Sequence, residues 1–188
     1  MISTTSLSKR KNLKQAFQLL GININRSFKN ESTILFLILD IFRKTITRYH
    51  DDCRHSNIAF PEVEIREIWK DVLDHSLKNN YIEIEEEIDV SLLTLIFELI
   101  NNQVYPMPGM MSVINRLTHN NMPLGIVSNA QFYTPVIMNY FISGDVKHDE
   151  QVLYFDPELQ SFSYKYRIAK PDTKLFEFII PVLDKNMG

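Results

Sequence analysis

The stretch that decides the fold is Leu124-Gly125-Ile126-Val127-Ser128-Asn129, a short apolar run that stops abruptly at two polar residues. Such a run predicts a buried parallel strand, because a strand covered on both faces is apolar throughout rather than alternating. Ligands of open parallel sheets lie beyond the carboxyl ends of the strands, so Ser128 and Asn129 stand where a binding site is expected. A serine hydroxyl can donate a hydrogen bond to an anionic oxygen there. The same Ser-Asn pair is also typical of a cap for the next helix.

Helical patterns flank this strand on both sides. A Pro/Gly turn at 104–109 precedes a helix over 110–119, and another helix is expected over 132–141. Farther along the chain, Lys170 comes before Pro171 and ahead of a last helix. The proline ring keeps Lys170 out of α geometry, and a lysine held extended at that place offers a compact positive charge to phosphate or carboxylate. Alternating helices and strands predict an α/β class.

The first hundred residues are expected to be helical, with no convincing β pattern. Apolar side chains recur there at spacings of three and four, which predicts helices over 13–20, 34–49, 61–77 and about 89–102. The third of these helices is expected to open with Pro61 in its first turn and to carry Glu62 and Glu64 where the helix dipole favours negative charge. We therefore expect an all-helical domain over 1–104 and an α/β domain over 105–188.

Two motifs, in this order and spacing, resemble a known family. Gly125-Ile-Val-Ser-Asn129 and Ala169-Lys-Pro-Asp-Thr-Lys-Leu-Phe176 are similar to motifs II and III of the haloacid dehalogenase-like (HAD) hydrolases. The helical first half is similar to the cap that these enzymes insert after their motif I. The resemblance implies a partial Rossmann-like core with a parallel sheet, preceded by a helical cap, and Mg²⁺-dependent hydrolysis of a small phosphorylated metabolite. It also implies that Ser128 hydrogen-bonds the transferring group, that Lys170 offsets negative charge and that Asn129 orients the substrate.

Motifs I and IV of that family have no counterpart in this sequence. Motif I ends in Asp-x-Asp-x-Thr, and the superficial match at Asp40 has Phe42 where the second aspartate belongs. A helical stripe runs through that segment, which predicts a cap helix with Asp40 near its solvent side. The acidic pair of motif IV would follow the last helix, and the chain ends at Gly188. We expect a truncated core that lacks the carboxylates for Mg²⁺ and has no turnover by itself.

Composition and charge exclude several classes of protein. The chain is 45% hydrophobic and 23% charged, which excludes disorder, and its five glycines exclude a glycine-rich phosphate loop. Residues 1–60 carry 10 basic and 4 acidic residues (+6), residues 61–104 carry 3 and 11 (−8), and the rest 7 and 8 (−1). This pattern is typical of neighbouring helix faces that attract each other. The basic residues cluster too little for a nucleic-acid surface, and no apolar run is long enough for a membrane span.

The remaining side chains leave two interpretations open. The lone Cys53 and the lack of a secretory signal favour a cytoplasmic protein, and the stretch His50 to His55 is interpreted as a helix end rather than a metal site. The hydrolase interpretation predicts a small phosphorylated molecule as partner. The competing interpretation is a non-catalytic interaction protein or a truncated relic, because a parallel sheet without its first strand leaves an unpaired edge that favours self-association.

Overall fold

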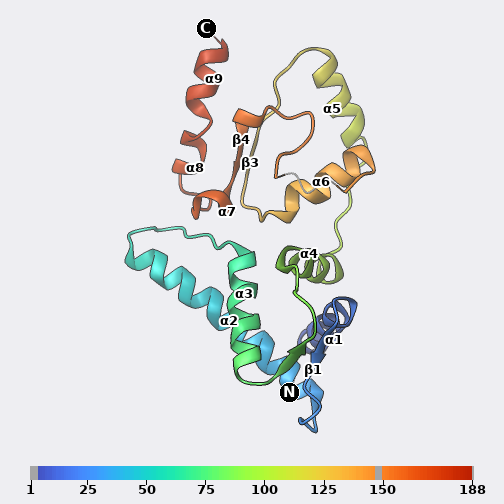
Figure 1. Cartoon of the computed structure of the whole chain (residues 1–188). Coiled ribbons are helices and arrows are strands. Elements are labelled where there is room, and N and C mark those ends of the chain that lie inside the picture. The colour runs from blue at the N-terminus through green and yellow to red at the C-terminus, as the bar shows by residue number, and fades with distance from the viewer. Residues whose placement is uncertain (1–3, 147–149, 188) are drawn as a thin grey trace. The chain divides into compact units, whose positions relative to one another are not determined.

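A computed structural model describes residues 4–146 and 150–187 and divides the chain into two compact units (Figure 1). As far as they are described, residues 1–49 and 65–104 form the first, which we call the helical unit. Residues 50–64 and 105–188 form the second, which we call the strand unit. Residues 50–64 thus belong to the strand unit, although the chain on both sides of them belongs to the helical unit.

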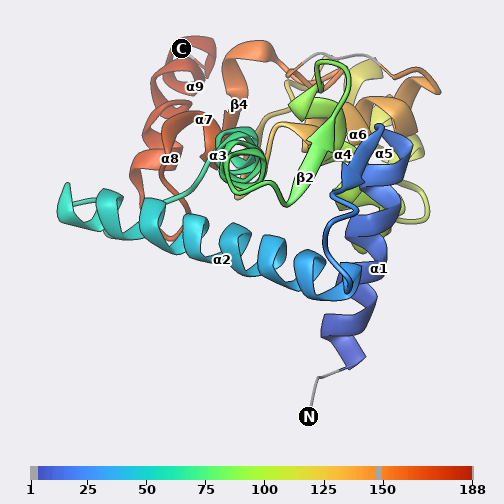
Figure 2. The ribbon, with the colours of Figure 1, turned by 60° about the horizontal axis from the view of Figure 1, so that its bottom comes forward.

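The helical unit is built around one tryptophan. Trp69 is 1% exposed, and its ring lies 4.7 Å from that of Phe42 and 5.0 Å from that of Phe97, measured between centroids. Burying such large rings against one another is the main source of stability that a small helical core has. The predicted helices are confirmed, and Figure 2 shows the second as one long helix. The helices are α1 Thr4–Leu19, α2 Glu31–His55, α3 Ile65–Lys78 and α4 Val90–Asn101.

A short antiparallel pair of strands corrects the expectation of an entirely helical first half. Strand β1, Ile22–Ile24, pairs antiparallel with β2, Ile82–Ile84. Ile22 and Ile82 are each 2% exposed, so both strands contribute to the core. The pattern was not predicted because each strand is only three residues long and its partner lies far away in the sequence, which leaves no periodic run to detect.

The segment before α3 corrects a second expectation. Pro61 does not open that helix, which begins at Ile65; it forms an isolated antiparallel bridge with Ile168. The flanking backbone groups pair across the same bridge, since the amide of Ala169 donates to the carbonyl of Phe60 at 2.8 Å. These backbone groups find partners in the strand unit, so the residues around Pro61 stay extended instead of entering the helix.

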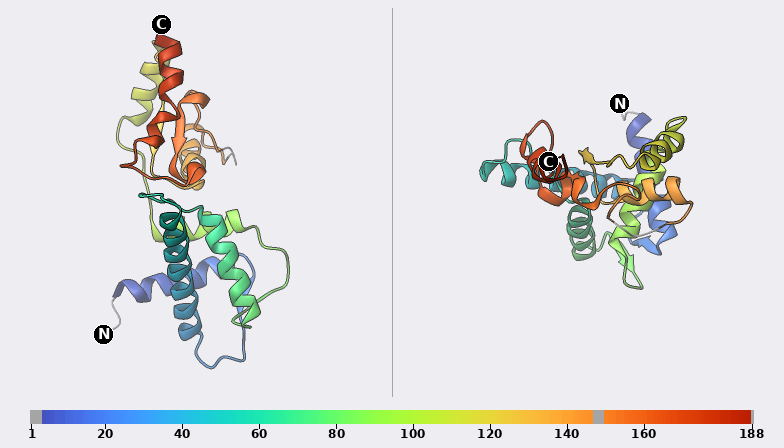
Figure 3. Two further views of the ribbon diagram at one scale, coloured as in Figure 1. Left: turned by 90° about the vertical axis from the view of Figure 1, so that its left-hand side faces the viewer. Right: turned by 90° about the horizontal axis from the view of Figure 1, so that it is seen from above.

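The strand unit mixes helices with a small parallel sheet, in agreement with the α/β class that the sequence predicts. Its strands β3, Ile126–Ser128, and β4, Gln160–Phe162, pair in parallel, with Ile126 opposite Gln160 and Ser128 opposite Phe162. The longer helices are α5 Met110–His119 and α6 Tyr133–Ser143. Short helices complete the unit and end in the red α8 and α9 of Figure 3: η1 Pro157–Leu159, α7 Ser163–Tyr166, α8 Lys174–Glu177 and α9 Ile180–Met187.

The two parallel strands differ in burial from what their sequences indicate. The apolar β3 is only half-buried, whereas the more polar β4 is buried throughout. Ser161 in β4 is accommodated because its hydroxyl donates to the carbonyl of Leu175 at 2.7 Å. Just before β3, a side chain on Gly125 would bring its Cβ within 3.0 Å of Leu159. Glycine therefore allows the chain to pass close to the turn that precedes β4.

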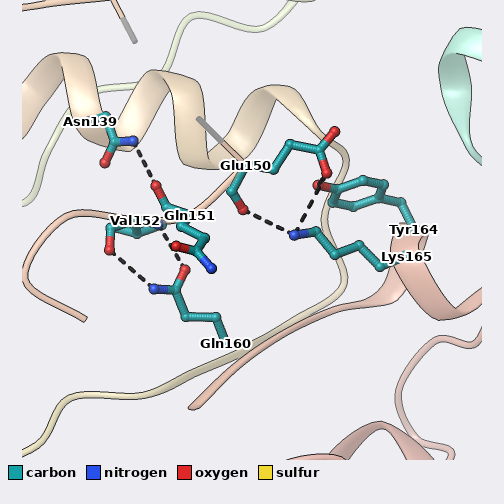
Figure 4. Close-up of polar contacts among 7 residues, drawn as sticks. All are labelled: Asn139, Glu150, Gln151, Val152, Gln160, Tyr164 and Lys165. Carbon is teal, nitrogen blue, oxygen red and sulfur yellow. Dashed lines mark hydrogen bonds and ion pairs between the residues drawn. The ribbon is translucent and has the colours of Figure 1, made fainter. Parts of the chain in front are cut away.

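Two buried side-chain amides hold the segment 151–153 in place (Figure 4). Asn139, on α6 and 0% exposed, donates to the carbonyl of Gln151 and accepts from the amide of Leu153, both at 2.8 Å. Gln160, on β4, accepts from the amide of Val152 at 2.7 Å and donates to its carbonyl at 3.1 Å. The two amides thus supply to this segment the donors and acceptors that a neighbouring strand would otherwise supply.

Candidate functional site

The candidate site lies at the carboxyl end of β3. Because β3 and β4 are parallel, both strands end at the same edge, where ligands of open parallel sheets bind. Ser128 is the last residue of β3 and is half-buried, and Asn129 follows it and is exposed. Helix α6 has Phe132 at its N-cap position without a side-chain cap. The Ser-Asn pair therefore does not serve as the helix cap that its sequence also allowed.

Asn129 and Lys170 are brought together although 41 residues separate them. The backbone amide of Lys170 donates to Asn129 Oδ1 at 2.7 Å, and Asn129 Nδ2 donates to the carbonyl of Lys170 at 3.2 Å. This reciprocal pair is the one that two backbone peptide groups form in a sheet. The side chain of Lys170 then turns to the strand, where Nζ donates to the carbonyl of Val127 at 3.1 Å.

Ser128 lies between the two residues that Lys170 contacts. Val127 precedes it and accepts from the ammonium, and Asn129 follows it and holds the backbone of Lys170. The amide of Asn129 and the ammonium of Lys170 are therefore joined at the strand end that Ser128 occupies. Both Asn129 and Lys170 are exposed, so an anion from solvent can reach them. The peptide bond between Lys170 and Pro171 is cis.

Sequence reasoning missed a second cluster at the same edge, formed by Glu62, Gln131 and Ser163, which we call the Glu62 cluster. Ser163 directly follows β4, is 0% exposed, and donates its hydroxyl to Glu62 Oε2 at 2.9 Å. The same Ser163 Oγ accepts from the amide of Ala130 at 2.9 Å. Gln131 Nε2 donates to Glu62 Oε1 at 3.2 Å and to the carbonyl of Val63 at 2.9 Å.

The Glu62 cluster fastens the segment 60–64 to the ends of both strands. Ala130 and Gln131 come just after β3, and Ser163 comes just after β4, so one carboxylate connects the two strand ends. The backbone of Glu62 adds a further link, because its amide donates to the carbonyl of Arg167 at 3.1 Å. Pro61 is the one local signal for an extended segment here, because it keeps the residue before it out of α geometry. No spacing in the sequence indicates the distant partners of Glu62.

Asp40 lies within α2, as the helical stripe predicts, and its carboxylate is already engaged. Lys44 donates to it at 2.7 Å, and Arg43 contacts it as well. The hydrogen bond from Lys44 lowers the pKa of Asp40 below its ordinary value of 3.8, and burial acts against that shift. A carboxylate held by two cations of its own helix is occupied in an intrahelical ion pair.

The residues at the β3 end do not fit a divalent cation. Mg²⁺ needs several oxygen ligands, whereas Asn129 Oδ1 already accepts from the amide of Lys170, and the ammonium of Lys170 would repel a cation. Among residues 4–146 and 150–187, no three His, Cys, Asp or Glu side chains gather as metal ligands. The stretch from His50 to His55 forms the end of α2, which agrees with its interpretation as a helix terminus.

Comparisons with known proteins found no match, so a functional proposal rests on the residues of this chain. No protein-family model matches the chain, and neither a curated protein nor a solved structure does. Within the described part of the chain, every helix is too short or too polar to cross a bilayer.

Proposed function

We propose that this chain is a haloacid dehalogenase-like segment that binds the phosphoryl group of a small phosphorylated metabolite and does not hydrolyse it unaided. The observation that supports this most is the reciprocal pair of hydrogen bonds between the side chain of Asn129 and the backbone of Lys170. The pair holds a lysine from one motif beside the strand end of the other. A phosphoryl group placed there would meet a positive charge and hydrogen-bond donors together.

The chemistry of binding follows from the donors at the strand end. The ammonium of Lys170 has three N–H donors, and one of them is directed to Val127. The others are free to turn to an anion in solvent, and the hydroxyl of Ser128 offers one more donor. Hydrogen bonds from a charged donor to phosphate oxygens are about twice as strong as neutral ones. Binding of a phosphoryl group therefore needs only the groups already gathered.

Hydrolysis needs more than these groups supply. Phosphoryl transfer requires a positioned nucleophile, and the superficial nucleophile match, Asp40, is held in an ion pair within α2. Phe42 stands where the family has its second aspartate. With a hydroxyl, an amide and an ammonium alone, the site stabilises negative charge but lacks the carboxylate that attacks phosphorus in this family, and a serine hydroxyl needs a general base to act in its place.

The test is a calorimetric titration of the full chain with inorganic phosphate and with phenyl phosphate. Lys170→Ala should weaken binding about tenfold or more, because a charge-assisted hydrogen bond is lost. Lys174→Ala removes the same charge from an exposed lysine on α8 and should leave the affinity unchanged. An equal loss of affinity in both variants would show that the anion responds only to the net charge of the chain, which would contradict the proposed site. If the chain hydrolyses phenyl phosphate in the presence of Mg²⁺ and Lys170→Ala abolishes this turnover, the proposal that the chain binds without hydrolysing is wrong.

A second candidate function is self-association through the sheet edge. In the described part of the chain, β3 pairs with β4 alone, and two strands of three residues form a sheet that is marginal by itself. Large apolar side chains near α5 are exposed, with Tyr105 at 78% and Met107 at 77%. Light scattering over a range of concentrations tests this candidate, and a cooperative melt of a strictly monomeric chain would contradict it.

A further inference from the structure

A groove of about 520 Å³ opens on the helical unit, apart from the strand-end site, between α3 and the loop that follows β2. Its apolar lining comes from Leu73 and Leu77 on α3 and from Ile84 at the end of β2. Leu77 is 39% exposed, so part of this apolar surface faces solvent. Burying it against apolar side chains of a partner would be favourable.

One side of the groove is a row of carboxylates. Glu85, Glu86 and Glu87 line it in sequence and are all exposed. Asp74 adds a fourth carboxylate to the lining, and Lys70 offsets one negative charge. In the part of the chain that the structure describes, these three glutamates make no ion pair or hydrogen bond.

That lack of partners distinguishes the row from three acidic residues elsewhere in the helical unit. Glu31 pairs with Lys14, Asp40 with Lys44, and Asp71 with Arg48. Adjacent glutamates without cations repel one another, and a partner that carries cations relieves the repulsion. The groove therefore combines an apolar floor with a rim of net negative charge.

We propose that this groove docks a basic amphipathic helix of a partner protein. Apolar side chains at helical spacing would cover Leu77 and Ile84, and lysines or arginines beside them would face Glu85–Glu87. Apolar contact would supply most of the affinity, and the charges would select the partner and speed association. The same charges repel an acidic peptide, a nucleic acid and an anionic membrane surface.

The experiment measures binding of a labelled synthetic helix to the full chain by fluorescence anisotropy. The peptide has about 15 residues, four helical turns, with leucines at i, i+3 and i+7 and lysines elsewhere. A triple variant, Glu85→Gln with Glu86→Gln and Glu87→Gln, should weaken binding about fivefold or more, since exposed ion pairs each contribute modestly. A peptide with glutamates in place of lysines should not bind.

A matched control separates the groove from the net charge of the chain. Asp52→Asn with Asp145→Asn and Glu158→Gln changes the charge equally at exposed positions of the strand unit, and should leave the affinity within about twofold. Leu77→Ser tests the apolar floor and should weaken binding in a chain that circular dichroism shows to be folded. Equal effects of both triple variants, or no effect of Leu77→Ser, would overturn the proposal. If the chain is a dimer and the peptide dissociates it, the proposal is also wrong, because a second copy of the chain would then occupy the groove.

Discussion

Removing the carboxylate of Glu62 should loosen the segment 60–64 from the strand unit. In Glu62→Ala, Ser163 and Gln131 both lose an acceptor, at 2.9 Å and 3.2 Å respectively. A hydrogen bond to a charged group contributes about 1.5–3 kcal/mol, and the longer bond less, so we expect a loss of about 2–3 kcal/mol in the strand unit. Ser163→Ala should cost about 1–2 kcal/mol, because the half-buried amide of Ala130 then loses its acceptor.

The assay must report on the strand unit alone. The one tryptophan, Trp69, lies in the helical unit, so its fluorescence follows the other half of the molecule. Amide hydrogen exchange measured by NMR is local, and two amides are informative: Ala130, which donates to Ser163, and Ala169, which donates to Phe60. In Glu62→Ala the protection of Ala169 should fall about 30-fold or more, the factor that corresponds to about 2 kcal/mol.

A double-mutant cycle provides the refutation. If Glu62 and Ser163 act as one unit, their double variant should be less destabilised than the sum of the single variants by about 1–2 kcal/mol. Glu158→Ala removes an exposed carboxylate from the same unit and should leave the protection of Ala169 unchanged. Additive effects, or a protection of Ala169 that Glu62→Ala does not change, would show that the carboxylate does not hold the segment.

Two further predictions concern other polar contacts. Asn139→Ala should destabilise the strand unit by about 2–3 kcal/mol, because two hydrogen bonds of a fully buried amide are lost, and exchange at the amide of Leu153 should report it. Unchanged exchange at Leu153 would show that Asn139 does not hold the segment 151–153 in place. Lys44→Ala should raise the pKa of Asp40 toward 3.8 in a carbonyl-carbon NMR titration, whereas Lys9→Ala should not. Since the folded-state pKa is lowered, this contribution to stability is present above pH 3.8 and lost as the pH falls through the folded-state pKa.

The helices were predictable because their signals are local. In α4, apolar residues recur at helical spacing, and Asp89 caps the helix by accepting from the amides of Ser91 and Leu92. Strand β3 was predictable for a similar reason, because its apolar run ends abruptly. Such signals depend on neighbouring residues, which a sequence shows directly.

The features that sequence reasoning missed depend on distant partners. β4 is buried although it reads Gln160-Ser161-Phe162, because Gln160 and Ser161 each find backbone partners that no local pattern reveals. Glu62 was assigned to a helix start, since its carboxylate suits a helix dipole. The carboxylate accepts from the neighbouring amide of Val63, and its side-chain partners lie 69 and 101 residues away. At the candidate site, the sequence located Ser128, Asn129 and Lys170 individually, and only the fold shows the bonds that join Asn129 to Lys170.

The assignment of residues 50–64 to the strand unit has a consequence for dissecting the protein. The chain passes between the units at three places, after residues 49, 64 and 104, so neither unit is one continuous piece of sequence. A fragment of residues 105–188 would lack Glu62 and the strand-like contact at Pro61. Co-expression with a peptide of residues 50–64 should restore what that fragment lacks. The two halves of the chain are therefore interleaved in sequence, and cutting at a single position cannot separate them intact.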